Sequence, residues 1–276
     1  GGQIDLAFYE RNLPQAALVS VMMANNETGS LFPIRDMAAR ARQAGVLFHA
    51  DCVQALGKVP VNVHDLGVDF ATFSAHKFYA LKGAGALYIR RGIQPPLQNL
   101  IHGGGQERHR RGGTENILAI AAFGELCLRS PEVVARGEEV RRLRDLLEEL
   151  ILKSIPGVHL TGAEGERIPN TSSLVIDGVD GEVLLMNLDL RGYSVSTGAA
   201  CSSGSPEPSP VLMAMGLSRQ EAQSSLRLSL GWNNNEDEVR RFAEDLGVVV
   251  KHLRAISTDW VSPPDTARAN INAGSI

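Results

Sequence analysis

The sequence predicts an α/β protein with a mostly parallel sheet flanked by helices, followed by a smaller α+β carboxy-terminal domain. Two observations predict the sheet. Short, almost wholly apolar runs are typical of strands buried on both faces, and amphipathic helical patterns separate them. The first two runs end in polar residues, and ligands of open α/β sheets bind at the carboxyl ends of strands. We therefore expect functional residues along that edge.

The elements of the first part follow from these patterns in chain order. Residues 16–24 (AALVSVMMA) are typical of a buried strand, and the turn cluster 25–29 (NNETG) follows it. Residues 34–45 have the spacing of an amphipathic helix that a glycine closes. Further strands are expected at 46–51, 69–73 and 86–89, and their alternation with helices favours parallel pairing with right-handed crossovers.

A polar, glycine-rich stretch, residues 102–116, precedes the second part. It is either a solvated loop or a loop that binds an anion through backbone N–H groups and arginines. We place a domain boundary near residue 130, which gives domains 1–130 and 131–257 and a frayed tail 258–276. The expected helices are 116–128, 131–155, 182–190, 210–215 and 235–256, and the expected strands are 171–177, 194–196 and 226–230.

The composition excludes several classes of protein. A formal net charge of −4 provides no basic field for nucleic acid or acidic membranes, and no apolar run approaches the ~20 residues of a membrane span. Cys52, Cys127 and Cys201 are too few and too far apart for a disulfide framework or a zinc site. The first residues (GGQID) include no initiator methionine and lack the pattern of a signal peptide, so we expect no signal peptide. We expect a cytoplasmic protein without a metal, nucleic-acid or membrane partner.

Lys77 lies between two apolar segments that are typical of core strands. A charged lysine is costly there, and condensation of its amine with an aldehyde removes the charge. The alternative is a surface lysine on a turn. Asp51 stands at a strand end in apolar surroundings, where it either caps the following helix or pairs with a cation such as a protonated pyridine nitrogen.

Four more residues are candidates for a site. Ser74 and His76 either cap the turn around Lys77 or donate to a phosphate. Cys201 lies in a loop of small residues, 197–210, which favours a reachable, reactive thiol, whereas Cys52 and Cys127 are expected to be inert packing residues. Arg227 is a lone cation in an alternating strand and either faces solvent or binds a carboxylate.

Six separated motifs together resemble a known family. They are 25–29 (NNETG), Asp51 with Gln54, 74–77 (SAHK), 111–114 (RGGT), 196–202 (STGAACS) and 224–227 (SSLR). Their order and type resemble the cysteine desulfurases of the NifS/IscS-like group, which are class V, fold-type I pyridoxal phosphate enzymes. The resemblance extends to about Leu253, and it implies an incomplete fold-type I large domain and a small domain that carries the cysteine loop.

The resemblance also implies a role for each matching residue. Lys77 carries pyridoxal 5'-phosphate and moves protons with His76 beside it, Asp51 pairs with the pyridinium nitrogen, and Cys201 takes the sulfur of L-cysteine as a persulfide while alanine is released. Cys201 could also be a transient iron–sulfur ligand. Gln54 contacts the ring hydroxyl and Thr114 reaches the phosphate of the other subunit of a homodimer. The remaining roles are phosphate binding by Ser74 and His76, and carboxylate binding by Asn26 and Arg227. Asn26 is also expected to contact the cofactor.

The sequence departs from the family pattern in three ways. Ala75 replaces a glycine, and Ala80 with Leu81 replaces a Gly-Pro pair that sets a turn. The family's amino-terminal segment, with its phosphate cup and a histidine stacked on the ring, has no counterpart here, so we expect weakened cofactor binding.

Two alternatives to a cysteine desulfurase remain from the sequence. One is another class V reaction, an aminotransferase or a selenocysteine lyase. The other is a catalytically silent module that dimerises or binds a sulfur acceptor. For the desulfurase, the expected partners are L-cysteine, a second copy of the chain, and a sulfur-acceptor protein such as an iron–sulfur scaffold.

Overall fold

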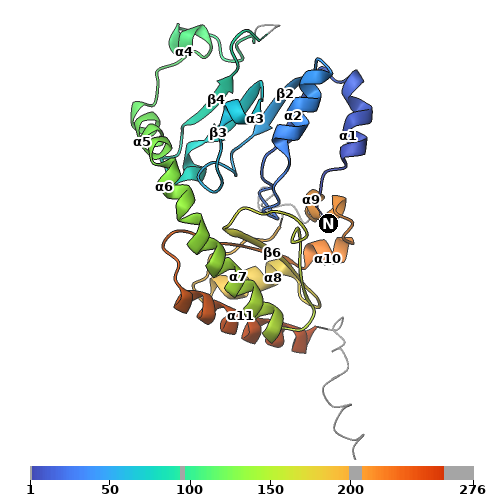
Figure 1. The fold of residues 1–276 in the computed structure, drawn as a ribbon. Coiled ribbons are helices and arrows are strands. Elements are labelled where there is room, and N and C mark those ends of the chain that lie inside the picture. Colours follow the sequence, from blue (N-terminus) through green and yellow to red (C-terminus); the bar gives the residue numbers. More distant parts are fainter. Residues whose placement is uncertain (1, 94–96, 199–206, 258–276) are drawn as a thin grey trace, which may run out of the picture. The chain divides into compact units, whose positions relative to one another are not determined.

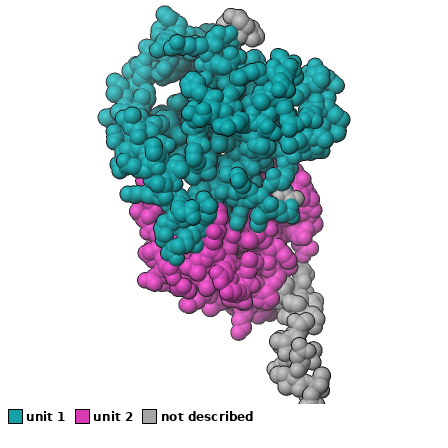
Figure 2. Space-filling model, in the orientation of Figure 1, with its two compact units in different colours: residues 1–142, 162–171 teal, residues 143–161, 172–276 magenta. Residues whose placement is uncertain are grey.

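A computed structural model describes residues 2–93, 97–198 and 207–257. The chain divides into two compact units, which Figure 2 distinguishes by colour. Unit 1 contains Gly1–Arg142 and Gly162–Thr171, and unit 2 contains Leu143–Thr161 and Ser172–Ile276. Among the described residues, none of the helices combines the length and apolar character that crossing a membrane requires.

Unit 1 is built on a four-stranded sheet with the strands in sequence order (Figure 1). The first three strands are parallel, as the sequence predicts, but the fourth is antiparallel to the third. Only residues 75–84 join these two strands, and a parallel crossover needs about a dozen residues or more. The strands are β1 (Leu18–Met22), β2 (Leu47–Asp51), β3 (Phe70–Ser74) and β4 (Gly85–Ile89).

One face of this sheet is buried under α1 (Leu6–Asn12) and α2 (Ile34–Gln43). Helix α2 buries its apolar residues at spacings of three and four, which is the pattern of a helix facing a core. Phe48 and Ala50 of β2 point into this core. The intervening residues His49 and Asp51 lie on the other face and are half-buried, because side chains alternate along a strand.

The sequence predicted one further helix only in part, and its longer piece begins in unit 1 and continues into unit 2. The expected helix 131–155 is divided at Arg136 into α6 (Ser130–Ala135) and α7 (Gly137–Ser154). At Gly137, a side chain would approach Pro169 and the carbonyl of Lys58, and glycine is a poor helix former. The other helical segments of unit 1 include α3 (Val63–Leu66), η2 (Ala75–Phe78), α4 (Gln106–His109) and α5 (Ile117–Leu128).

Unit 2 contains a three-stranded sheet, β5 (Val158–Leu160), β6 (Thr171–Ile176) and β7 (Ser225–Ser229). Its core is formed by β6, α8 (Gly181–Asp189) and the long helix α11 (Glu236–Ile256). Residues 194–196, expected as a strand, form only a single bridge between Ser196 and Arg227. The remaining helices of this unit are α9 (Pro210–Ala214) and α10 (Arg219–Gln223).

The packing of Gly57 against Phe78 generates a stability prediction. Gly57 follows β2, has a φ of +73°, and a side chain there would overlap the ring of Phe78. We expect Gly57→Ala to lower the free energy of unfolding by about 1–3 kcal/mol more than a glycine-to-alanine change that creates no overlap. Denaturant titration of the two variants measures the difference.

Gly45→Ala is the matched control. Gly45 has a φ of +72° and no neighbouring atom within 4 Å of an added side chain. Alanine there should therefore lower the free energy of unfolding by about 1–2 kcal/mol through backbone strain alone, without an overlap. Equal losses in the two variants would show that the Phe78 contact is unimportant.

Candidate active site

The predicted site residues of unit 1 follow three neighbouring parallel strands. Met22, Asp51 and Thr72 are adjacent in register across β1, β2 and β3. Since these strands run the same way, their carboxyl ends lie at one edge of the sheet. Asn26, Gln54 and Lys77 come three to five residues after these registered positions. The edge therefore gathers residues that are far apart in the sequence.

Asp51 is held in place at the end of β2. Its Oδ1 accepts a hydrogen bond of 2.9 Å from the Val53 N–H, and its carbonyl accepts one of 2.8 Å from the Met23 N–H. Three residues later, the Oε1 of Gln54 accepts a 2.6 Å hydrogen bond from the ammonium of Lys58. The carboxylate thus belongs to a turn whose start is hydrogen-bonded to the residue that follows β1.

The turn that carries Lys77 is anchored by its neighbours. Ala75 and Phe78 of η2 are 0% and 1% exposed, and Tyr79 closes the turn with a φ of +60°. The N–H of Ala80 donates to the carbonyl of Ala75 at 3.1 Å. Lys77 itself is exposed. Of the two alternatives for this lysine, the chain as described has the surface turn, because Ala75 and Phe78 occupy the inward positions.

Ser74 and His76 form a polar pair beside Lys77. The Oγ of Ser74 lies 3.0 Å from the Nδ1 of His76. The donor in this contact depends on the imidazole tautomer. The half-buried hydroxyl and the exposed ring stand at the end of β3, where both can donate to an anion.

A third polar feature, His49, was not identified as a site residue from the sequence. Its Nδ1 lies 2.8 Å from the Ser20 hydroxyl and its Nε2 lies 3.1 Å from the Thr72 hydroxyl. The imidazole thus connects three strands on the face that also carries Asp51. Burial lowers its pKa, and the Asp51 charge partly opposes that shift. The sequence contained one signal that could have identified His49 as a site residue. His49 and Asp51 are two residues apart in a strand, so their side chains lie on the same face.

The two asparagines of the turn after β1 differ in burial and in role. Asn25 is buried, and its Oδ1 accepts hydrogen bonds from the N–H groups of Glu27 and Thr28 at 2.8 and 3.0 Å. It shapes the turn. Asn26, the predicted ligand of the substrate carboxylate, is half-buried, so its side chain is the more accessible of the two.

The glycine-rich stretch 102–116 contains a short helical segment, α4, in addition to loop structure. A side chain on Gly112 would lie 2.8 Å from the carbonyl of His102, so the two ends of this stretch approach each other closely. Arg111 donates to the carbonyl of Gly113 at 2.6 Å, and Thr114 is exposed. The threonine is accessible to a second molecule.

In unit 2, Arg227 lies at the anchored start of the cysteine loop. Its backbone exchanges hydrogen bonds with Ser196 in an antiparallel bridge, at 2.6 and 3.2 Å. The Gly198 N–H then donates to the Ser225 hydroxyl at 3.3 Å. Cys201 lies outside the described residues. Ser196 and Gly198, just before the part of the loop that the structure does not describe, are therefore held beside β7.

The other two cysteines differ from each other. Cys52 is 0% exposed, and burial raises the pKa of its thiol to about 12, which confirms it as a packing residue. Cys127 is exposed, so its predicted place in the core is wrong. It lies near the end of α5, most of whose apolar residues face outward.

Comparison with known proteins identifies the family. Residues 1–242 match the family described as aminotransferase class V. The chain belongs to the class V aminotransferase family. Within the family it is similar to a cysteine desulfurase of Cereibacter sphaeroides, with 44% identity over 93% of this chain, and to the cysteine desulfurase NifS of Azotobacter vinelandii, with 41% identity over 94%.

A solved structure supports the same assignment. The X-ray structure of a NifS-like protein from Rickettsia africae matches with a TM-score of 0.83 and 35% identity, and covers 91% of this chain and 67% of that one. This confirms the predicted fold class. The chain spans 65% and 64% of the length of the Cereibacter and Azotobacter proteins.

The class V family uses pyridoxal phosphate, and the side chains at this edge fit that group chemically. An aldehyde needs a primary amine, a pyridinium nitrogen needs a carboxylate, and a phosphate needs hydrogen-bond donors. Lys77, Asp51, and the pair of Ser74 and His76 supply these groups at the ends of two adjacent strands. Within the described residues, no group of three His, Cys, Asp or Glu side chains could hold a metal ion.

His49 generates a prediction about pH. Its pKa is lowered in the folded protein, so the unfolded chain binds more protons as the pH falls below about 6.5. We expect the free energy of unfolding to decrease as the pH falls from there through the folded-state pKa. NMR titration of the His49 ring and denaturation over this pH range measure both effects.

His49→Gln should remove this part of the pH dependence. His102→Gln is the control, because His102 is an exposed histidine of the same unit. A His49 ring that titrates at or above the usual pKa would contradict the prediction.

Proposed function

We propose that this chain provides the residues of a pyridoxal phosphate-dependent cysteine desulfurase. The reaction transfers the sulfur of L-cysteine to Cys201 and releases L-alanine. The observation that carries the proposal is the gathering of Lys77, Asp51, Ser74 and His76 at the carboxyl edge of the sheet. The similarity to named cysteine desulfurases of two bacteria supports the choice of reaction within the family.

The residues of unit 1 hold the cofactor and move protons. Lys77 binds the aldehyde and then carries a proton to and from the substrate, Asp51 keeps the pyridine nitrogen protonated, and Gln54 donates to the ring hydroxyl. Ser74 and His76 bind the phosphate, together with Thr114 from a second subunit. Bound pyridoxal phosphate supplies an electron sink for bond cleavage at the substrate carbons.

The sulfur transfer is assigned to Cys201. Its thiolate attacks the substrate sulfur, so that an S–S bond forms while the C–S bond breaks. The electron pair of the C–S bond remains with the carbon skeleton, which takes up a proton delivered by Lys77 and leaves as alanine. The transferred sulfur is oxidised and the carbon is reduced, so no external oxidant is required. Arg227 and Asn26 hold the substrate carboxylate during this step.

Exposed apolar side chains support a homodimer. Helix α5 exposes 72% of Ile117, 78% of Leu118 and 80% of Leu128, and such patches mark interaction surfaces. The same helix packs against η2, which carries Lys77. We infer that a second copy covers α5 and brings its Thr114 near this site.

The proposed reaction also requires a protein that accepts the persulfide sulfur and a compartment that keeps the thiol reduced. A protein that takes sulfur from Cys201, such as an iron–sulfur scaffold, consumes the product. We place the reaction in the reducing cytoplasm, which keeps an unpaired thiol free.

Mass spectrometry after incubation with pyridoxal phosphate and L-cysteine tests the function. We expect one added sulfur on the peptide of Cys201 and release of alanine. Cys201→Ser should abolish the adduct, whereas Cys127→Ser should retain it, because Cys127 belongs to α5 of unit 1 and not to the cysteine loop. Alanine without any adduct on Cys201 would favour a different class V reaction.

Lys77 is tested separately by borohydride reduction in the presence of pyridoxal phosphate. The label should appear on the peptide of Lys77 and be lost in Lys77→Ala. Lys82→Ala is the control, since Lys82 is a second exposed lysine five residues away. A protein that takes up no cofactor would favour the silent module.

The dimer is tested by sedimentation. Leu118→Glu should shift the protein towards the monomer, because a charge is costly in a buried apolar interface. Leu190→Glu is the matched control: this leucine of unit 2 is 85% exposed. The dimer proposal fails if wild type sediments as a monomer or if both variants behave alike.

A further inference from the structure

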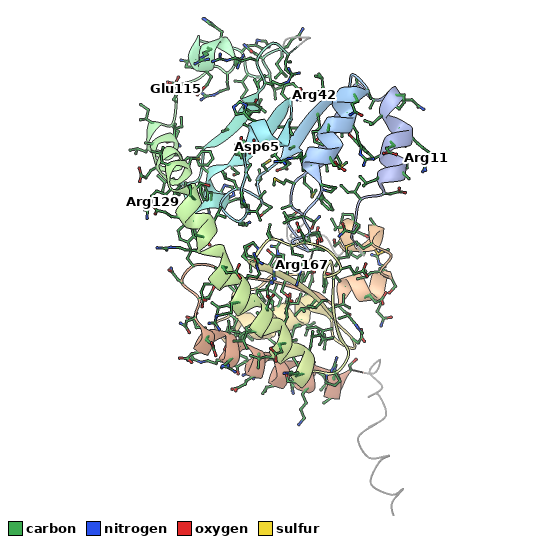
Figure 3. The ribbon with its side chains drawn as sticks, in the orientation of Figure 1. Arg11, Arg42, Asp65, Glu115, Arg129 and Arg167 are labelled. Carbon is green, nitrogen blue, oxygen red and sulfur yellow. The ribbon has the colours of Figure 1, made fainter. Side chains whose placement is uncertain are left out.

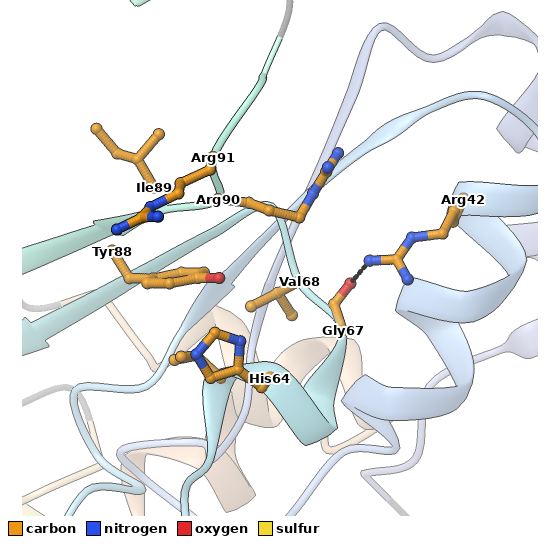
Figure 4. A pocket seen from close by; sticks show the side chains of 9 residues that line it. Arg42, His64, Gly67, Val68, Tyr88, Ile89, Arg90 and Arg91 are labelled. Carbon is orange, nitrogen blue, oxygen red and sulfur yellow. Dashed lines mark hydrogen bonds between the residues drawn. The ribbon is translucent and has the colours of Figure 1, made fainter.

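A cationic hollow lies at the opposite end of the unit 1 sheet, next to the amino end of β3 (Figure 4). Its volume is about 490 Å³, within the range of small-molecule sites. Val68, one of its lining residues, precedes β3, whereas Ser74 ends that strand. At about 3.3 Å per residue, the two places are separated by roughly 20 Å. The hollow is therefore distinct from the candidate active site.

Three arginines from two parts of the chain line this hollow. Arg42 comes from α2, and Arg90 and Arg91 follow β4. The residues that line it include no aspartate or glutamate. The nearby carboxylate of Asp69 is buried and occupied, because it accepts from the Arg90 Nε at 2.7 Å and from the Phe48 N–H at 2.8 Å. On a chain with a net charge of −4, this local excess of positive charge favours an anion.

Two of the guanidinium groups are held in position. The Nη2 of Arg42 donates to the carbonyl of Gly67 at 2.6 Å, as the dashed line in Figure 4 marks. Gly67 has a φ of +69°, and a side chain there would contact that guanidinium at 3.7 Å. Arg90 is fixed by Asp69. Ordered arginines bind phosphate or carboxylate oxygens with less loss of side-chain entropy than mobile ones.

The wall of the hollow also contains aromatic rings. Tyr88 and His64 pack edge to face, with ring centroids 6.1 Å apart and planes at 80°. Figure 4 shows Tyr88, His64 and Arg91 on one side and Arg42 on the other. A flat ring can stack on such a surface while its anionic group meets the guanidinium groups. The volume also exceeds what a lone inorganic anion needs.

We propose that this hollow binds a small aromatic anion of the mononucleotide class. The phosphate contacts Arg42, and the base packs against the opposite wall, which Tyr88, His64 and Arg91 form. The probe is AMP, compared with adenosine and inorganic phosphate by calorimetric titration at low ionic strength, since salt screens exposed charges. We expect saturable AMP binding with a Kd of ~1 mM or tighter, and at least tenfold weaker binding of adenosine and of phosphate.

Substitutions locate the binding site. Arg91→Gln should weaken AMP binding at least tenfold, and Arg42→Gln should do the same. Arg11→Gln is the matched control, because Arg11 is an exposed arginine on α1, whereas Arg42 lies on α2 (Figure 3). Ser74→Ala should also leave AMP binding unchanged, which separates this hollow from the phosphate site proposed near Lys77. Circular dichroism checks that each variant is folded.

Three outcomes would overturn the proposal. They are absence of saturable AMP binding at millimolar concentration, AMP binding that is unchanged in both Arg42→Gln and Arg91→Gln, and phosphate binding as tight as that of AMP. The last result would show that the aromatic wall contributes nothing.

Discussion

The candidate active site depends on the packing of Phe78 against Gly57. Phe78 is fully buried, and its ring occupies the space that any side chain at position 57 would need. Gly57 belongs to the turn that follows Asp51, and Phe78 is the neighbour of Lys77. One apolar contact therefore fixes the segment with the amine against the segment with the carboxylate. The Cys52 N–H donates to the Thr72 carbonyl at 3.0 Å and joins the two strand ends, and the apolar contact joins the two turns beyond them.

The exposure of Lys77 connects the chemistry to the surface of unit 1. Capture of an aldehyde needs a neutral amine, and burial favours the neutral form. Lys77 is exposed in the single chain, so the proposed reaction requires that something covers it. Because α5 packs against the turn of Lys77 and exposes apolar side chains, whatever covers α5 also approaches the lysine. Assembly and catalytic competence are thus expected to be linked.

Much of this fold could be predicted from the sequence because its signals are local. The apolar run of β1, the helical spacing of α2 and the capping asparagine of α11 each specify an element by themselves. The strand β5 was missed because three residues are too short for a pattern. The antiparallel direction of β4 follows from the length of its connection, which outweighs the general alternation of strands and helices.

The sequence was enough to predict which residue types form the candidate site, but not how exposed their side chains are or what they contact. Polar residues after successive parallel strands lie at one edge, so the sequence was enough to place Asp51 and Lys77 at the ends of neighbouring strands. The exposure of a side chain depends on which elements pack over it, and no local pattern contains that information. The contacts of His49 with Ser20 and Thr72 likewise depend on strand register, which sets partners from distant segments side by side.

The two ends of the unit 1 sheet should act independently. β3 joins them: Asp69 at its start is bound to Arg90 and to the backbone of β2, and Ser74 at its end is bound to His76. Coupling between distant sites requires an element with two arrangements that both ligands bias. The central strands β2 and β3 are paired on both sides, and the sheet packs against α2, which favours one arrangement. An anion at the arginines should therefore leave the cofactor edge unchanged, so the hollow at the arginines and the edge at Lys77 can be studied separately by substitution.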